Sequence, residues 1–218
     1  LKELIEQYSN PGDTVLDPFA GYGVFGCEAL IMNRNVILND LNPVANFLNN
    51  QLLQKDIDLL LIEKQWKNIK AEFEPFVAKW YEWDIDGEIV QLTSILRDKN
   101  NIPIKAKYKL NGNRSGTEFE IGKNDAEKYL NFENLQTIDD WFPTTKLIKN
   151  SRISAKEGMD VSDLFTKRTL SCHARLLSLI ETYSSGVEKD LFKVAFTANL
   201  ANCSKLVPPI KSRGAMAP

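Results

Sequence analysis

The chain has 218 residues, of which 43% are hydrophobic and 26% charged, a composition typical of a soluble globular protein and unlike that of disordered or collagen-like chains. Its formal net charge is -2, and no apolar run approaches the roughly 20 residues that a membrane-spanning helix needs. Three dispersed cysteines without a C-x-x-C pair argue against a disulfide framework and a zinc site. These features predict a cytoplasmic protein with no bound metal and no membrane association.

The first third of the chain predicts the start of a parallel α/β sheet. A helix ending near Tyr8 precedes a strand over residues 13–17, a loop, and a helix over residues 24–32. A second strand is expected over residues 35–40, and Pro43 suits the first turn of the helix that follows. Strands and helices that alternate in this way are typical of parallel sheets.

A long helix is expected next, over residues 56–81, and near Trp83 the hydrophobic period changes. Three strands joined by turn-forming residues are then predicted, at residues 88–97, 102–110 and 117–121. Helical periodicity returns at residues 163–181 and 187–202. We therefore expect three parts: a cofactor-binding part over residues 1–82, an inserted antiparallel β region over 83–145, and a helical return to the first domain over 146–218.

The most informative residues lie where the first strand passes into the first helix. Asp17-Pro18-Phe19-Ala20-Gly21-Tyr22-Gly23 follows the first strand, and Asp40-Leu41-Asn42 follows the second. Glycines here let the backbone approach a ligand, and a carboxylate at the end of the next strand can accept both hydroxyl hydrogens of a ribose. Asp40 lies 23 positions after Asp17, close to the spacing of roughly 20 residues that this role requires. The pattern predicts a nucleoside-containing cofactor.

Charge discriminates between two such cofactors. Gly21-Tyr22-Gly23-Val24-Phe25-Gly26 matches G-x-G-x-x-G, the dinucleotide signature, so an NAD-dependent oxidoreductase is one alternative. A dinucleotide would place its pyrophosphate beside Asp17, where the two negative charges would repel each other. S-adenosylmethionine has no phosphate and carries an ammonium and a sulfonium, so the acidic strand end favours this methyl donor.

The same residues resemble a known family. Residues 10–23, which include D-P-F-x-G-x-G, and Asn39-Asp40-Leu41-Asn42-Pro43 look like the cofactor motifs of S-adenosylmethionine-dependent DNA methyltransferases that modify exocyclic amines, as in restriction-modification systems. The resemblance implies a Rossmann-like fold and methyl transfer to the amine of adenine, or of cytosine, in double-stranded DNA. It also implies that Phe19, Gly21 and Gly23 line the methionine end of the donor, that Asp40 binds its ribose, and that a restriction endonuclease is a candidate partner. The whole predicted cofactor site comprises Asp17, Pro18, Phe19, Ala20, Gly21, Gly23, Asp40, Leu41 and Asn42.

The D-P-P-Y-like tetrad that such enzymes use to hold the target amine is missing from the sequence. Val207-Pro208-Pro209-Ile210 lacks the polar acceptor and the ring, and Asp140-Trp141-Phe142-Pro143 has the wrong order. We therefore expect no catalytic residue in this chain and a tetrad that lies outside it. The alternative is a non-catalytic DNA-recognition subunit with a vestigial cofactor fold.

Basic residues of the inserted region, and two at the start of a later helix, are candidates for DNA contacts. Lys105, Lys107 and Lys109 alternate with apolar residues, so strand geometry places their ammonium groups on one face. The candidates for phosphate binding are Lys105, Lys107, Lys109, Arg114, Lys167 and Arg168. The alternatives are that the three lysines form the solvated face of an edge strand and that Lys167 and Arg168 only cover the start of a helix. We expect His173, the only histidine, to be structural.

Overall fold

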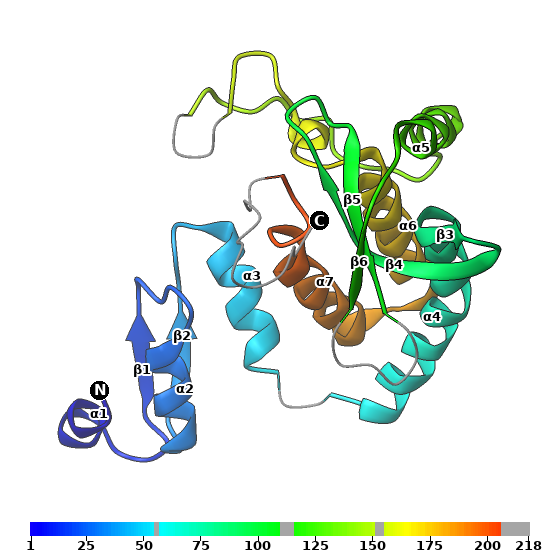
Figure 1. Ribbon diagram of the computed structural model, residues 1–218. Helices are drawn as coiled ribbons and strands as arrows, with labels where there is room; N and C mark the ends of the chain where they lie inside the picture. The colour runs from blue at the N-terminus through cyan, green and yellow to red at the C-terminus, as the bar shows by residue number, and fades with distance from the viewer. Residues whose placement is uncertain (55–56, 110–115, 151–154, 206–218) are drawn as a thin grey trace. The chain divides into compact units, whose positions relative to one another are not determined.

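The computed structural model describes residues 1–54, 57–109, 116–150 and 155–205 and has a mixed α/β fold (Figure 1). Its contacts divide the chain into two compact units. The first contains Leu1–Leu59 and Ser185–Val194, and the second contains Leu60–Ser184 and the chain from Ala195. The three-part division expected from the sequence remains a prediction. Within the described residues, every helix is too short or too polar to cross a membrane.

The first unit begins with the predicted alternation of helices and strands. The elements are α1 (Lys2–Tyr8), β1 (Thr14–Asp17), α2 (Val24–Ile31), β2 (Asn35–Leu38) and α3 (Pro43–Leu52). Strands β1 and β2 pair in parallel, with Thr14 opposite Asn35 and Asp17 opposite Leu38. The parallel strands joined through a helix confirm the expected start of a parallel α/β sheet, and both strands therefore end at the same edge.

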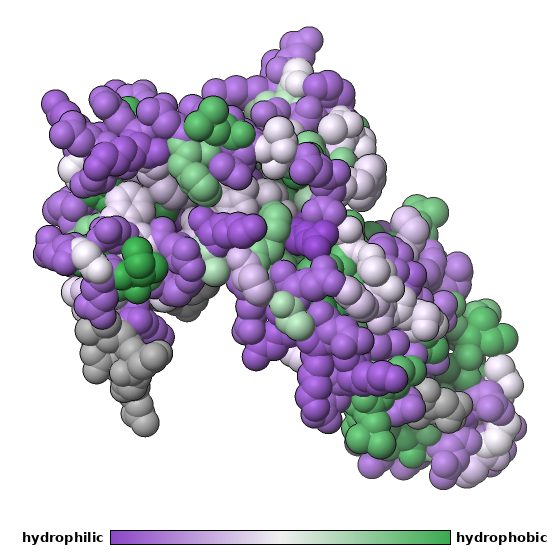
Figure 2. All heavy atoms as spheres, turned by 90° about the vertical axis from the view of Figure 1, so that its right-hand side faces the viewer, coloured by the Kyte–Doolittle hydropathy of each residue, from purple (hydrophilic) through white to green (hydrophobic). Residues whose placement is uncertain are grey.

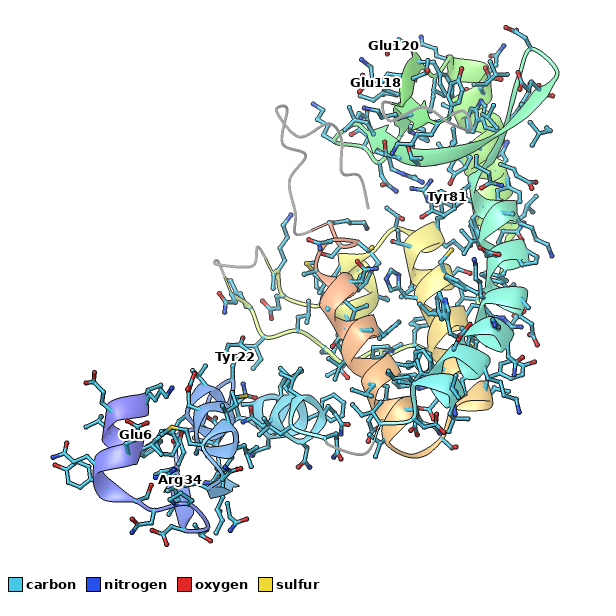
Figure 3. All side chains as sticks on the ribbon, turned by 90° about the horizontal axis from the view of Figure 1, so that it is seen from below. Glu6, Tyr22, Arg34, Tyr81, Glu118 and Glu120 are labelled. Carbon is cyan, nitrogen blue, oxygen red and sulfur yellow. The ribbon has the colours of Figure 1, made fainter. Side chains whose placement is uncertain are left out.

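A buried arginine joins the first helix to the turn between α2 and β2. The guanidinium of Arg34, which is 8% exposed, donates to the carbonyl of Ser9 at 2.6 Å and to that of Met32 at 2.7 Å. Its Nε also donates to Oγ of Ser9 at 3.0 Å, and Figure 3 labels this side chain. Since the charge is satisfied by three acceptors, its burial is compatible with a stable fold.

A glycine brings α2 close to β2. A Cβ atom on Gly26 would lie 2.7 Å from Cδ1 of Leu38, closer than any real contact between carbon atoms. Only glycine fits at this position without a shift of Leu38. In a strand–loop–helix unit of this kind, the last glycine of G-x-G-x-x-G has the same packing role.

The second unit contains an antiparallel sheet that follows a long helix. Helix α4 (Leu59–Tyr81) leads into strands that pair in the order β3-β4-β5-β6: β3 (Glu82–Ile85), β4 (Glu88–Arg97), β5 (Pro103–Tyr108) and β6 (Thr117–Glu120). The antiparallel pairing confirms the predicted character of this region. Strand β3 was not predicted, and it joins β4 through Asp86 and Gly87, both with positive φ, as a tight hairpin requires.

Helix α5 (Lys123–Leu135), which was also not predicted, packs on this sheet. Tyr129 of α5 forms one core cluster with four strand residues, Val90, Leu92, Ile95 and Ala106. A buried ion pair adds to this packing, because both terminal nitrogens of Arg97 donate to the carboxylate of Glu133 at 3.0 Å.

The remaining described elements are helical: the short 3-10 helix η2 (Val161–Leu164), α6 (Lys167–Tyr183) and α7 (Gly186–Leu200). The sequence predicted a helix from residue 163, but α6 begins later. The reason is local capping, since Oγ1 of Thr166 accepts the backbone N–H of Thr169 and starts a new helix there. Figure 2 shows mostly hydrophilic side chains on the face that it displays, with separate groups of hydrophobic ones.

Candidate cofactor site

The candidate site lies where the two parallel strands end. Asp17 is the last residue of β1, and its carbonyl accepts the backbone N–H of Asn39, which follows β2, at 2.9 Å. Asp17 and Asp40 therefore emerge at the same edge of the sheet. In open parallel sheets, the crevice at the carboxyl ends of the strands is where ligands bind.

The glycines of the loop after β1 have two different roles. Gly21 and Gly23 have φ angles of 50° and 73°, in the left-handed region that other residues seldom adopt. A Cβ atom on Gly23 would lie 2.5 Å from Oδ1 of Asn49, so this glycine is enclosed, whereas a Cβ atom on Gly21 would meet nothing within 4 Å. The loop is thus packed at Gly23 and open at Gly21, the side from which a ligand could approach.

The two carboxylates bind the loops that surround them. The backbone N–H of Gly21 donates to Oδ2 of Asp40 at 2.8 Å, and that of Asn42 donates to Oδ1 of Asp40 at 2.8 Å. Oδ1 of Asp17 accepts the backbone N–H of Phe19 at 3.0 Å. The N–H groups of Asn42 and Gly21 lower the pKa of Asp40, because they stabilise its charged form. At neutral pH, Asp40 is an anion held in one orientation.

Backbone bonds also connect the loop after β1 to the loop after β2. The N–H of Ala20 donates to the carbonyl of Asn39 at 2.9 Å, and Ala20 is 7% exposed. Three residues of these loops are exposed to solvent: Pro18, Phe19 (86% exposed) and Leu41 (99% exposed). Tyr22, labelled in Figure 3, is exposed as well. The structure therefore brings all the predicted cofactor residues together at the end of β1 and in two adjoining loops, with exposed apolar side chains beside them.

Helix α3 begins at this site and contributes residues that we did not predict. The predicted Asn42 is its N-cap and accepts the backbone N–H of Val44 at 3.0 Å. Asn46 forms two hydrogen bonds with the backbone of Asp40, and Asn49 donates to the carbonyl of Gly21 at 3.1 Å. Their helical spacing from Asn42 was the sequence signal that could have identified them.

Residues 1–46 match the DNA methylase family model. The match includes both loops of the site and the start of α3, and it covers less than a quarter of the chain. No curated protein and no solved structure matches the chain.

The predicted DNA contacts on the antiparallel sheet are paired with acidic residues. Nζ of Lys105 lies 3.0 Å from Glu120 and 3.9 Å from Glu118, and Nζ of Lys107 lies 3.5 Å from Glu118. Figure 3 labels both glutamates on β6. The nearby Glu120 raises the pKa of Lys105. Lys109 is exposed, and no ion pair is formed by it among the described residues.

The other predicted DNA contacts differ in their accessibility. Nζ of Lys167 is exposed and donates to the carbonyl of Asn134 at 3.1 Å. Arg168 is only 1% exposed, and its guanidinium lies 4.2 Å from the ring centre of Tyr81, so it cannot reach a phosphate from this position. The structure gives Arg168 a packing role in place of the DNA contact that we expected. Arg114 and the sequence 207–210 lie outside the described residues.

His173 is held within the second unit by ordinary packing. Its Nδ1 lies 2.7 Å from the carbonyl of Thr169. Its ring centre lies 5.8 Å from that of Phe165 and 5.7 Å from that of Phe196, beside an apolar cavity of about 360 Å³. Burial lowers its pKa. Among the described residues, no group of three or more histidine, cysteine or acidic side chains could hold a metal ion.

Proposed function

We propose that the chain binds S-adenosylmethionine and provides the donor-binding part of a DNA amino-methyltransferase. The choice of cofactor rests on one observation: the groups that accept hydrogen bonds from the backbone N–H groups of the loops. In a dinucleotide site these groups and the helix N-terminus receive a pyrophosphate. Here the N–H groups of Phe19 and Gly21 already donate to the carboxylates of Asp17 and Asp40.

Two carboxylates at this position favour a cationic ligand over a phosphate. A pyrophosphate would have to displace them and would then lie beside their negative charge, which is unfavourable at any effective dielectric constant. The ammonium and sulfonium of the methyl donor carry the complementary charge. The argument therefore favours the methyl donor over the nicotinamide alternative.

Each part of the site has a role in this proposal. Asp40 accepts the ribose hydroxyls, Phe19 and Gly21 contact the methionine end, and the charge of Asp17 attracts the ammonium. When bound, the cofactor supplies an electrophilic methyl group. The chain itself contributes binding and orientation, and the tetrad that receives the target amine is expected outside these 218 residues.

The proposed substrate is an exocyclic amine of adenine, or of cytosine, in double-stranded DNA. In the sequence, residues 97–114 contain six basic and one acidic side chain, a local excess that favours DNA binding, and Lys109 among them is exposed. We extend the proposal to a cytoplasmic restriction-modification system with an endonuclease partner. A methylation-sensitive digest of DNA from the source cells tests this extension.

Calorimetric titration of the purified chain tests the cofactor assignment. We expect S-adenosylhomocysteine, the demethylated donor, to bind, and NADH to give no heat of binding under the same conditions. Tight binding of NADH without binding of S-adenosylhomocysteine would overturn the proposal and establish the oxidoreductase alternative.

A further inference from the structure

Three asparagines lie along one face of α3, and the side chains of two of them form hydrogen bonds with parts of the chain outside the helix. Asn42, Asn46 and Asn49 are separated by four and three positions, so they lie along one side of the helix. Asn42 caps the helix itself. The other two reach the two loops that form the candidate cofactor site, and neither loop belongs to the helix.

Asn46 fixes the backbone of Asp40 at two points. Its Oδ1 accepts the N–H of Asp40 at 2.9 Å, and its Nδ2 donates to the carbonyl of Asp40 at 2.7 Å. A side-chain amide that satisfies both groups of one residue replaces the pairing that an adjacent strand would give. Because β2 ends at Leu38, Asp40 lies beyond the sheet, and Asn46 fixes the backbone from which its carboxylate extends.

Asn49 binds the glycine loop. Its Nδ2 donates to the carbonyl of Gly21 at 3.1 Å, while the N–H of Gly21 donates to Asp40. The two loops and the helix thus form one closed chain of hydrogen bonds: Asn46 to Asp40, Asp40 to Gly21, and Gly21 to Asn49.

The burial of Asn49 argues that this bond has a purpose beyond packing. Asn49 is 4% exposed, and its Oδ1 is buried without a hydrogen-bond partner among the described residues. A buried acceptor that lacks a donor is destabilising, and an apolar side chain of similar size would avoid that cost. The amide is useful here only through its bond to Gly21.

We propose that Asn46 and Asn49 are positioning residues that hold Asp40 and Gly21 in the geometry that receives the methyl donor. The inference rests on the proposed function and extends it to two residues that need not touch the ligand. It predicts that each asparagine affects donor binding through the loop that it holds.

Asn46→Ala and Asn49→Ala test this inference, with Asn35→Ala as the matched control. Nδ2 of Asn35 also donates to a glycine carbonyl, that of Gly12 at 2.9 Å, but at the opposite end of the strands. We measure the Kd for S-adenosylhomocysteine by calorimetry and, without ligand, the thermal midpoint. Each test variant is expected to weaken binding by about 5- to 10-fold, the equivalent of one ordinary hydrogen bond, and the control to leave it unchanged.

A pH profile separates positioning from a general loss of structure. The N–H of Gly21 helps to keep Asp40 ionised, so a loosened loop returns the pKa of Asp40 toward its ordinary value. As the pH is lowered, the affinity of Asn49→Ala for S-adenosylhomocysteine should therefore begin to fall at a higher pH than that of the unchanged protein. Asn46, which is only half-buried, provides a second variant if Asn49→Ala fails to fold.

The outcomes are distinguishable. If the unchanged protein binds S-adenosylhomocysteine and both test variants bind it with the same affinity and pH profile, this inference is overturned and the proposed function stands. If the unchanged protein does not bind it at all, the proposed function is overturned, and the inference with it.

Discussion

Replacement of Asp40 by alanine tests the arrangement of the candidate site directly. The substitution removes both oxygens that now accept the N–H groups of Gly21 and Asn42 at 2.8 Å, and with them the proposed acceptor of the ribose hydroxyls. Loss of one hydrogen bond to a charged group weakens binding by about 10- to 150-fold. We expect the Kd for S-adenosylhomocysteine to rise by at least the lower of these factors.

Asp13→Ala is the matched control for this prediction. Oδ2 of Asp13 accepts the N–H of Asn10 at 2.8 Å, so a comparable bond is lost just before β1, at the end of the strand away from the site. Calorimetry gives the Kd of each variant, and circular dichroism with a thermal melt shows whether it is folded. A folded Asp40→Ala protein that binds as tightly as the unchanged protein would refute the role assigned to Asp40.

Four further predictions concern stability and DNA binding. Gly23→Ala should lower the free energy of unfolding by at least about 1–2 kcal/mol, measured in urea, because its φ is 73° and the added Cβ would lie 2.5 Å from Oδ1 of Asn49. Glu133→Gln should lower it by about 3–5 kcal/mol, since Arg97 loses its buried partner. Burial lowers the pKa of His173, so the unfolded chain binds the proton more tightly; stability should fall as pH drops below 6.5, and less so in His173→Phe. Lys105→Ala should reduce the salt dependence of DNA binding, with a slope smaller by about 0.9 if one phosphate contact is lost; an unchanged slope would exclude that contact.

The beginning of the fold was predictable because its signals are local. Pro11 and Gly12 mark a turn, and the residues from Asp17 to Gly23 combine a strand end with a glycine loop. Each of these features acts within a few positions of the sequence. The predicted strands and helices of the first 53 residues are accordingly confirmed, with small shifts at their ends.

Features that depend on contacts between distant residues were not predictable in the same way. Helix α5 has mixed polarity, and its stability comes from Tyr129 in the sheet core and from Glu133, which pairs with a residue 36 positions earlier. Strand β3 is short and is defined by its partner β4.

Arg168 shows how a local pattern can mislead. Beside Lys167 it looked like part of a basic surface pair, but one position along a helix rotates a side chain by about 100°. Lys167 is only partly buried, while Arg168 shares the buried side of α6 with Cys172, four positions later. The burial of Arg168 could be inferred only from the residues along the whole buried face of the helix.

The glutamates of β6 have a consequence for how this sheet could discriminate among DNA sequences. A phosphate that approaches Lys105 or Lys107 competes with a carboxylate of the same molecule for the ammonium group. The attraction of the sheet to DNA of any sequence is thereby weakened, since each new lysine–phosphate contact partly replaces an existing lysine–glutamate ion pair. In the proposed DNA complex, such a surface would release random DNA readily and retain only a site whose bases add contacts of their own.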